Sequence, residues 1–180
     1  MTEPQPHTTS AADPACDVAH GEAHESRAPT RSVVAIFATP VARFLLSYAR
    51  DAGFRPVLVE PDDAQVPPGE GGFTRARSLD GYLDGDADVV VTDHHRSELG
   101  PMLRDALAGR TRWVGIMGNP KHPAPHIPAL AALGVRQEEI ARVHRPIGLN
   151  IGSHTPAEIA LATMAGLIAD RNGRPGGFTF

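Results

Sequence analysis

From Ser32 onward, short apolar runs alternate with segments of helical periodicity. Four of the runs carry apolar residues on both faces, which is typical of strands buried inside a parallel sheet. A fifth run, more polar, holds a shorter strand. In order, the five are SVVAIFA (32–38), RPVLVE (55–60), FTRARSL (73–79), DADVVVT (86–92) and TRWVGIM (111–117).

Helical segments separate these runs. The clearest starts at Thr39-Pro40, a good cap and first-turn pair, and ends near Gly53. Further helices are predicted over 80–83, 97–108, 127–133, 137–143 and 156–172. Strands alternating with helices predict an α/β protein. We expect a three-layer Rossmann-like fold with a mainly parallel sheet of about five strands.

The chain divides into an N-terminal tail, residues 1–31, and a domain, residues 32–180. The tail carries five acids and two bases and has almost no branched aliphatic residues, so we expect it to be disordered. The domain is almost neutral, which argues against nucleic acid as a partner. No secretory h-region and no membrane-length apolar run is present, so a cytoplasmic protein is expected.

Candidate ligand chemistry lies where strands end, because open parallel sheets bind ligands beyond the carboxyl ends of their strands. Four such junctions occur: Ala38–Pro40, Thr92–His94, Gly115–Lys121 and Gly152–Glu158. Each offers backbone N–H groups at or near a helix N-terminus, which attract anions.

The last junction carries the sequence PIGLNIGSHTPAEIA (146–160). Thr155 and Glu158 have the spacing of a capping box, with Pro156 at the first helical position. These residues start the helix, or contribute to a ligand site as well. Capping does not explain Gly148 and Gly152, which permit positive φ or the close approach of a ligand or another loop.

The first junction lacks the glycines that a dinucleotide fingerprint needs, since it reads Phe37-Ala38-Thr39-Pro40-Val41-Ala42. This argues against NAD(P) as cofactor. Glu60 stands where a ribose-binding acid would lie, and the alternative is a solvated carboxylate at a strand end. The missing glycines favour the solvated carboxylate.

The remaining polar candidates give weak signals. Lys121, the only lysine, follows a glycine turn and could meet a phosphate or stand exposed. Asp93, His94 and His95 are consecutive, so on extended backbone they should not converge. The other histidines lack metal-ligand spacing, and Cys16 stands alone. We therefore expect no metal site and assign no catalytic residue.

Three stretches resemble one known family: ADVVVTDHH, WVGIMGNPKH and EIARVHRPIGLNIGSHTPAEIALATMAGLIADRNG, most densely over 86–173. The family is the XdhC/CoxI group, whose C-terminal domain is Rossmann-like. The resemblance implies an accessory or maturation protein, rather than an enzyme, for a molybdenum hydroxylase such as xanthine dehydrogenase. Molybdenum cofactor is the implied ligand and the apo-hydroxylase the implied partner, while a homodimer stays open.

By this resemblance, two loops hold the cofactor. The implied binding residues are Gly115, Gly118, Asn119, Lys121, Gly148, Asn150, Gly152, Thr155, Pro156 and Glu158. The chain departs from the family at the first turn, usually G-A-G-H-V-A, and at Asn150, usually an acid. Cys16 does not match the cysteine of the family's N-terminal domain. The alternatives are an NAD(P)-dependent oxidoreductase and a degenerate protein-binding scaffold.

Overall fold

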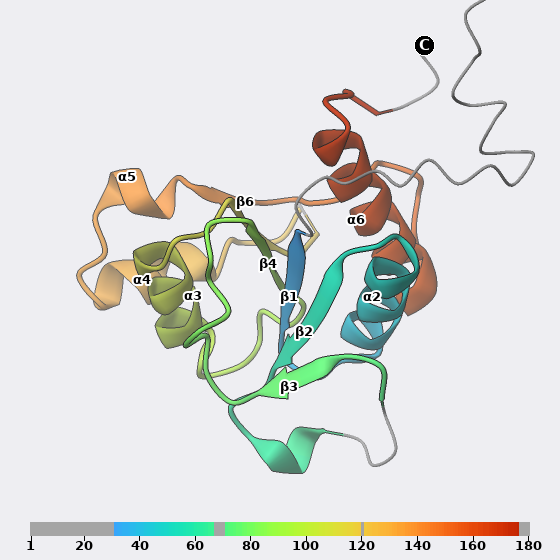
Figure 1. Ribbon diagram of the computed structural model, residues 1–180. Coiled ribbons are helices and arrows are strands. Elements are labelled where there is room, and N and C mark those ends of the chain that lie inside the picture. Colours follow the sequence, from blue (N-terminus) through green and yellow to red (C-terminus); the bar gives the residue numbers. More distant parts are fainter. Residues whose placement is uncertain (1–30, 67–70, 120, 177–180) are drawn as a thin grey trace, which may run out of the picture.

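The computed structural model describes residues 31–66, 71–119 and 121–176, and the predicted tail lies outside these ranges except for Arg31. The sheet has six parallel strands in the order β3-β2-β1-β4-β5-β6 (Figure 1). The strands are β1 (Ser32–Ile36), β2 (Arg55–Val59), β3 (Thr74–Ala76), β4 (Ala87–Val91), β5 (Trp113–Ile116) and β6 (Val143–His144).

The sheet separates two hydrophobic clusters. Successive residues of β1 alternate between them, since Val34 and Ile36 belong to one cluster and Val33 and Ala35 to the other. This two-sided burial is why the strand shows no polar alternation in the sequence. Helices α2 (Pro40–Asp51) and α6 (Pro156–Arg171) cover one face, and α3 (Leu99–Ala108), α4 (His126–Ala132) and α5 (Gln137–Ile140) lie on the other side (Figure 1). The predicted three-layer Rossmann-like architecture is confirmed.

Helix α2 begins as predicted. The Thr39 hydroxyl accepts a hydrogen bond from the Ala42 N–H at 3.0 Å, and Pro40 occupies the first turn. Gly53 follows the helix with a φ of 78°, a conformation that favours glycine. A single 3-10 turn, η1 (Asp63–Gln65), follows β2.

Two details differ from the predicted elements. The predicted helix over 80–83 is absent, and residues 80–82 form a turn instead, because Gly81 takes a φ of 80°, outside the helical region. Helix α5 ends at Ile140, and Val143 instead pairs with Val114 as part of β6. A strand of two residues has no periodicity to detect, so only its pairing with β5 reveals it.

A buried ion pair supports the amino end of the sheet. One terminal nitrogen of Arg31 lies 2.7 and 2.6 Å from the two carboxylate oxygens of Asp88, which is fully buried in β4. Burial raises the pKa of the Asp88 carboxyl, and the Arg31 guanidinium opposes that rise. No helix among the described residues is both long and apolar enough to cross a membrane.

Candidate functional site

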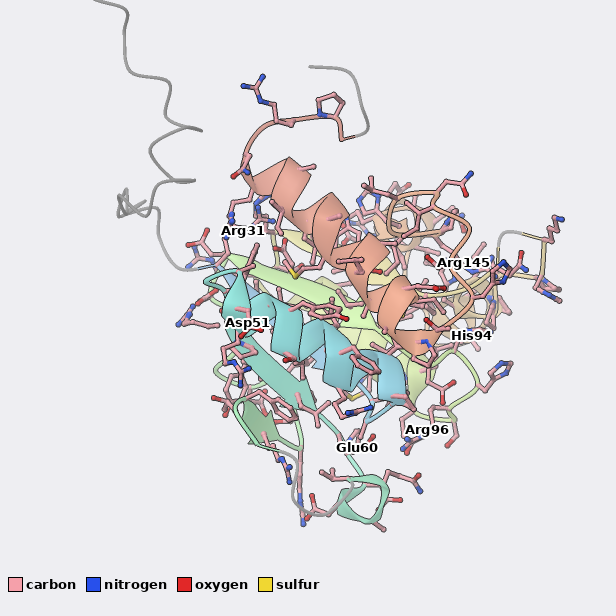
Figure 2. All side chains as sticks on the ribbon, turned by 90° about the vertical axis from the view of Figure 1, so that its right-hand side faces the viewer. Arg31, Asp51, Glu60, His94, Arg96 and Arg145 are labelled. Atoms are coloured by element: carbon pink, nitrogen blue, oxygen red, sulfur yellow. The ribbon has the colours of Figure 1, made fainter. Side chains whose placement is uncertain are left out.

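The carboxyl edge of the sheet gathers the polar side chains of several junctions. Figure 2 shows Glu60, Arg96, His94 and Arg145 following one another along this edge, with Arg31 at the opposite end of the sheet. We divide the edge into two halves. The first half is the first junction, which is the turn after β1 together with Glu60 and Arg96. The second half is the chain that follows β5 and β6.

At the first junction, the carboxylate of Glu60 binds the protein's own backbone. The Ala38 N–H donates to Glu60 Oε2 at 2.8 Å, and the Asp62 N–H donates to Oε1 at 3.1 Å. Glu60 is only 2% exposed, so its interpretation as a solvated strand-end carboxylate is wrong. The reason is that these two amides and a cation replace the water that a buried carboxylate loses.

The cation is Arg96. Its terminal nitrogens lie 3.0 and 3.3 Å from the two oxygens of Glu60, and one of them also lies 3.0 Å from Glu98. Its guanidinium covers the ring of Phe37 at 4.8 Å. Arg96 lowers the pKa of Glu98 to about 2. The positive charge of Arg96 is therefore compensated within the chain.

The first turn is also fixed by buried side chains. Phe37 is fully buried and takes a φ of 77°, an uncommon value for a residue other than glycine. The Thr92 hydroxyl lies 3.0 and 2.9 Å from the carbonyl oxygens of Ile36 and Phe37, and the Thr39 hydroxyl lies 3.0 Å from that of Thr92. The ring of Phe37 is thus part of the core and does not project into the turn.

The two histidines after β4 lie side by side, although neighbouring residues of an extended segment point to opposite faces. The rings of His94 and His95 lie 4.1 Å apart, because the chain bends at these two residues. Asp93 accepts from the His95 N–H at 2.8 Å. Burial, with a contribution from His95, lowers the pKa of His94. Within the described ranges no three His, Cys, Asp or Glu side chains are placed to hold a metal ion.

In the second half of the edge, Gly115 is explained by packing. A Cβ on this residue of β5 would lie 2.1 Å from the ring of Trp113, which itself stacks on His144 at 5.3 Å. The glycine therefore makes room for an aromatic side chain of the same strand. Its buried position in β5 separates it from the exposed loop that follows.

The loop after β5 brings Gly118, Asn119 and Lys121 together in one turn. The Lys121 N–H donates to the Asn119 side chain at 2.9 Å, and the lysine side chain is exposed. Arg145, which follows β6, crosses this loop: its guanidinium donates to the carbonyl oxygens of Asn119 at 2.8 Å and His122 at 3.3 Å. A Cβ on Gly118 would lie 2.6 Å from Arg145 Nε, so Gly118 makes room for this arginine.

The two glycines before α6 have different surroundings. Gly148 takes a φ of 86°, and a Cβ there would lie 3.0 Å from the backbone nitrogen of Thr163. Its neighbour Leu149 donates a hydrogen bond to the Ala162 carbonyl at 3.1 Å. Gly152 takes a φ of 68° with open space around it. The close approach predicted for Gly148 is therefore to α6, whereas Gly152 faces solvent.

The predicted capping box of α6 is present. The Glu158 N–H donates to the Thr155 hydroxyl at 3.2 Å, and the Glu158 carboxylate accepts from the N–H groups of Thr155 at 3.0 Å and His154 at 2.7 Å. Those amides lower the pKa of Glu158. Pro156 lies at the first helical position and Asn150 is exposed in the loop. Glu158 thus satisfies two of the amides that could otherwise have bound an anion.

Three of the cavities lined by described residues lie near the elements discussed above. One, about 650 Å³, lies beside β2 and β3 and includes Glu60, and another, about 570 Å³, lies between residues 77–83 and α3. The third, about 230 Å³, is lined by His126 and Arg145 among others. None of the three is lined by Gly118 or Gly152. Sequence reasoning missed Arg145, although its position directly before the PIGL motif was a usable signal.

The fold and this carboxyl edge define a Rossmann-type domain whose first turn is closed by its own side chains. Residues 33–167 match the family model of the XdhC Rossmann domain. The chain therefore belongs to the XdhC family.

Two further proteins are similar to it. The uncharacterized protein YqeB of Escherichia coli K12 is 32% identical over 89 residues, which are 49% of this chain and 16% of YqeB. A crystal structure described as a xanthine dehydrogenase from Bacillus halodurans superposes with a TM-score of 0.66 at 20% identity, over 84% of this chain and 46% of the other. The chain thus spans less than half of either protein, and the superposition bears on the fold alone.

Proposed function

We propose that this protein is an accessory protein for a molybdenum hydroxylase of the xanthine dehydrogenase type, and that it handles molybdenum cofactor rather than catalysing a reaction. Membership of the XdhC family, over residues 33–167, is the observation that carries the proposal.

The loops after β5 and before α6 are the proposed contact region for the cofactor. They supply the exposed Lys121, the exposed Asn150 and the open turn at Gly152. The cofactor carries a phosphate and a flat pterin. The Lys121 cation and exposed backbone N–H groups suit the phosphate. Gly152 has no side chain, which suits the close approach of the pterin ring. Gly115 and Gly148, which pack against Trp113 and α6, would act by shaping these loops.

Two experiments test the proposal. The full chain is co-expressed with an apo-hydroxylase, captured by a tag, and its bound pterin is oxidised and measured by fluorescence. We expect recovery of the hydroxylase, of pterin, or of both, and recovery of neither contradicts the proposal.

In the second experiment, Lys121→Ala should lower pterin binding about tenfold or more, because it removes a charge-assisted contact. The matched control, the exposed Arg136→Ala, should leave binding unchanged.

A nucleotide-dependent oxidoreductase is the alternative, and the first junction disfavours it. The Ala38 N–H, which a pyrophosphate could use, donates to Glu60, and Arg96 covers Phe37 beside it. We propose that NAD(P) does not bind. A thermal shift on adding NAD(P) would support the alternative, since ligand at 100 times its Kd stabilises a protein by about 2.7 kcal/mol. Capture of a protein partner without pterin would favour the degenerate scaffold.

A further inference from the structure

The smallest of the three cavities lies between α4, α5 and the residue that follows β6. Its volume is about 230 Å³, and three polar side chains contribute to its lining: His126, Gln137 and Arg145. The rest of the lining is aliphatic, from residues such as Ile140 and Val143. A mainly apolar cavity with a few convergent polar groups is the usual form of a small-ligand site.

Arg145 brings a positive charge that no carboxylate balances. Its terminal nitrogens donate to the carbonyl oxygens of Asn119 and His122, which are neutral, and its buried Nε has no hydrogen-bond partner within the described ranges. Among the described residues no Asp or Glu lies within ion-pair distance of it. The carboxylates of α5 are engaged elsewhere, since Glu139 pairs with Arg142.

His126 adds a second polar group without a partner. It is 4% exposed, and its buried Nδ1 makes no hydrogen bond with the described residues. Burial lowers the pKa of His126, and the charge of Arg145 lowers it further. A buried polar atom without a partner is unfavourable, and a bound group that supplies the hydrogen bond removes that cost.

We infer that this cavity binds a small oxyanion, the phosphate or carboxylate group of a small molecule, between Arg145 and His126. A guanidinium matches such groups in charge and geometry, and an imidazole N–H or the amide of Gln137 can donate to a further oxygen. At about 30 Å³ for each water, the cavity has room for roughly seven water molecules. This accommodates an oxyanion together with a small attached group.

This site borders the proposed cofactor loop after β5, but the inference does not depend on the molybdenum-hydroxylase proposal. Its polar side chains come from α4, α5 and the end of β6, whereas the exposed cofactor candidates are Lys121, Asn150 and Gly152. Arg145 connects the two regions, because it also holds the carbonyl groups of the 119–122 turn. Inorganic phosphate tests the cavity without any pterin or client enzyme.

The test is an NMR titration of the full chain at constant ionic strength, with sodium phosphate in one arm and sodium acetate in the other. The imidazole Cε1–H signal of His126 is assigned by its loss in His126→Gln. We expect a saturable shift of this signal and a rise in the pKa of His126, because a bound anion favours the charged ring. A response to phosphate, acetate or both identifies the oxyanion, and no response to either overturns the inference.

Variants locate the binding, and their affinities are measured by isothermal titration calorimetry, because His126→Gln lacks the imidazole signal. Arg145→Lys and His126→Gln should each weaken the binding of the effective anion about tenfold or more, since each removes a hydrogen bond to a charged group. The matched control, His122→Gln, changes an exposed histidine of the neighbouring turn and should bind as the unaltered chain does. Unchanged affinity in both Arg145→Lys and His126→Gln would place the anion elsewhere and overturn the inference.

Discussion

The two halves of the carboxyl edge handle charge in opposite ways. At the first junction, Arg96 lies within 3.0 Å of both Glu60 and Glu98, and the Glu60 carboxylate also accepts two backbone N–H groups. In the second half, the hydrogen bonds of Arg145 to described residues all go to carbonyl oxygens, and His126 Nδ1 has no partner among those residues.

This difference indicates which half of the carboxyl edge remains able to bind an anionic ligand. A carboxylate that already fills the amides and the guanidinium of a junction competes with any anionic ligand there, by charge and by position. A guanidinium bound only to neutral groups keeps its charge available. Mutation of each arginine distinguishes the two halves. Removal of Arg96 leaves a buried carboxylate without its cation, whereas removal of Arg145 leaves only neutral carbonyl groups without a donor.

The largest loss of folding stability is expected for Arg96→Met, which leaves Glu60 buried without its cation. Breaking a buried ion pair on one side typically costs about 3–5 kcal/mol, because the remaining charge is uncompensated. Urea unfolding of the variant and the unaltered chain measures the loss. The exposed Arg136→Met is the control and should change stability by less than about 0.5 kcal/mol. Equal stability of all three proteins would mean that Glu60 is not held as described.

Gly148→Ala should have the next largest effect, lowering the free energy of unfolding by about 2 kcal/mol or more. It adds the cost of a positive φ to a contact of 3.0 Å with the backbone of α6. Gly152→Ala is the matched control, since its φ is also positive but the space around it is open. We expect about 1 kcal/mol for the control. Thermal and urea unfolding compare the two, and equal losses would contradict the close approach of Gly148 to α6.

Arg145→Met should lower the free energy of unfolding by about 1–2 kcal/mol, which is less than the loss expected for Arg96→Met. It removes hydrogen bonds to two carbonyl groups but leaves no buried carboxylate unpaired. Urea unfolding measures this, and hydrogen exchange should show faster opening of the 118–122 turn. A loss as large as that of Arg96→Met would show that Arg145 compensates a negative charge, which contradicts the contrast between the two halves.

The smallest effect is a pH dependence that comes from His126. Its folded pKa is lowered, so the unfolded chain binds the proton more readily and folding stability rises with pH. The contribution is fully present above the unfolded value of about 6.5 and is lost as the pH falls from there through the folded pKa. Urea unfolding between about pH 7.5 and 5.5 should therefore show a shallower decline for His126→Gln than for the unaltered chain. An identical decline would mean that His126 is not buried as a neutral ring.

The sequence predicted local features wherever neighbouring residues decide them. The apolar runs gave five of the six strands, and Thr155-Pro156-Ala157-Glu158 gave the start of α6 with its capping box. Capping and strand burial depend on residues a few positions apart, or on the two faces of one segment. The predicted cofactor residues of the two loops remain a prediction, and the glycine pattern alone did not indicate which glycines serve packing.

Contacts between distant segments were decided only by the tertiary structure. Glu60 and Arg96 are 36 positions apart, and Arg145 reaches Asn119 across 26 positions. The burial of Glu60, the packing of Gly148 on α6 and the unpaired state of His126 all depend on which elements the sheet order places side by side. The sequence by itself therefore determined the family, the layers and the helix starts. The tertiary structure decided where charge is compensated and where it is left open, because electrostatic pairing depends on distance in space and not along the chain.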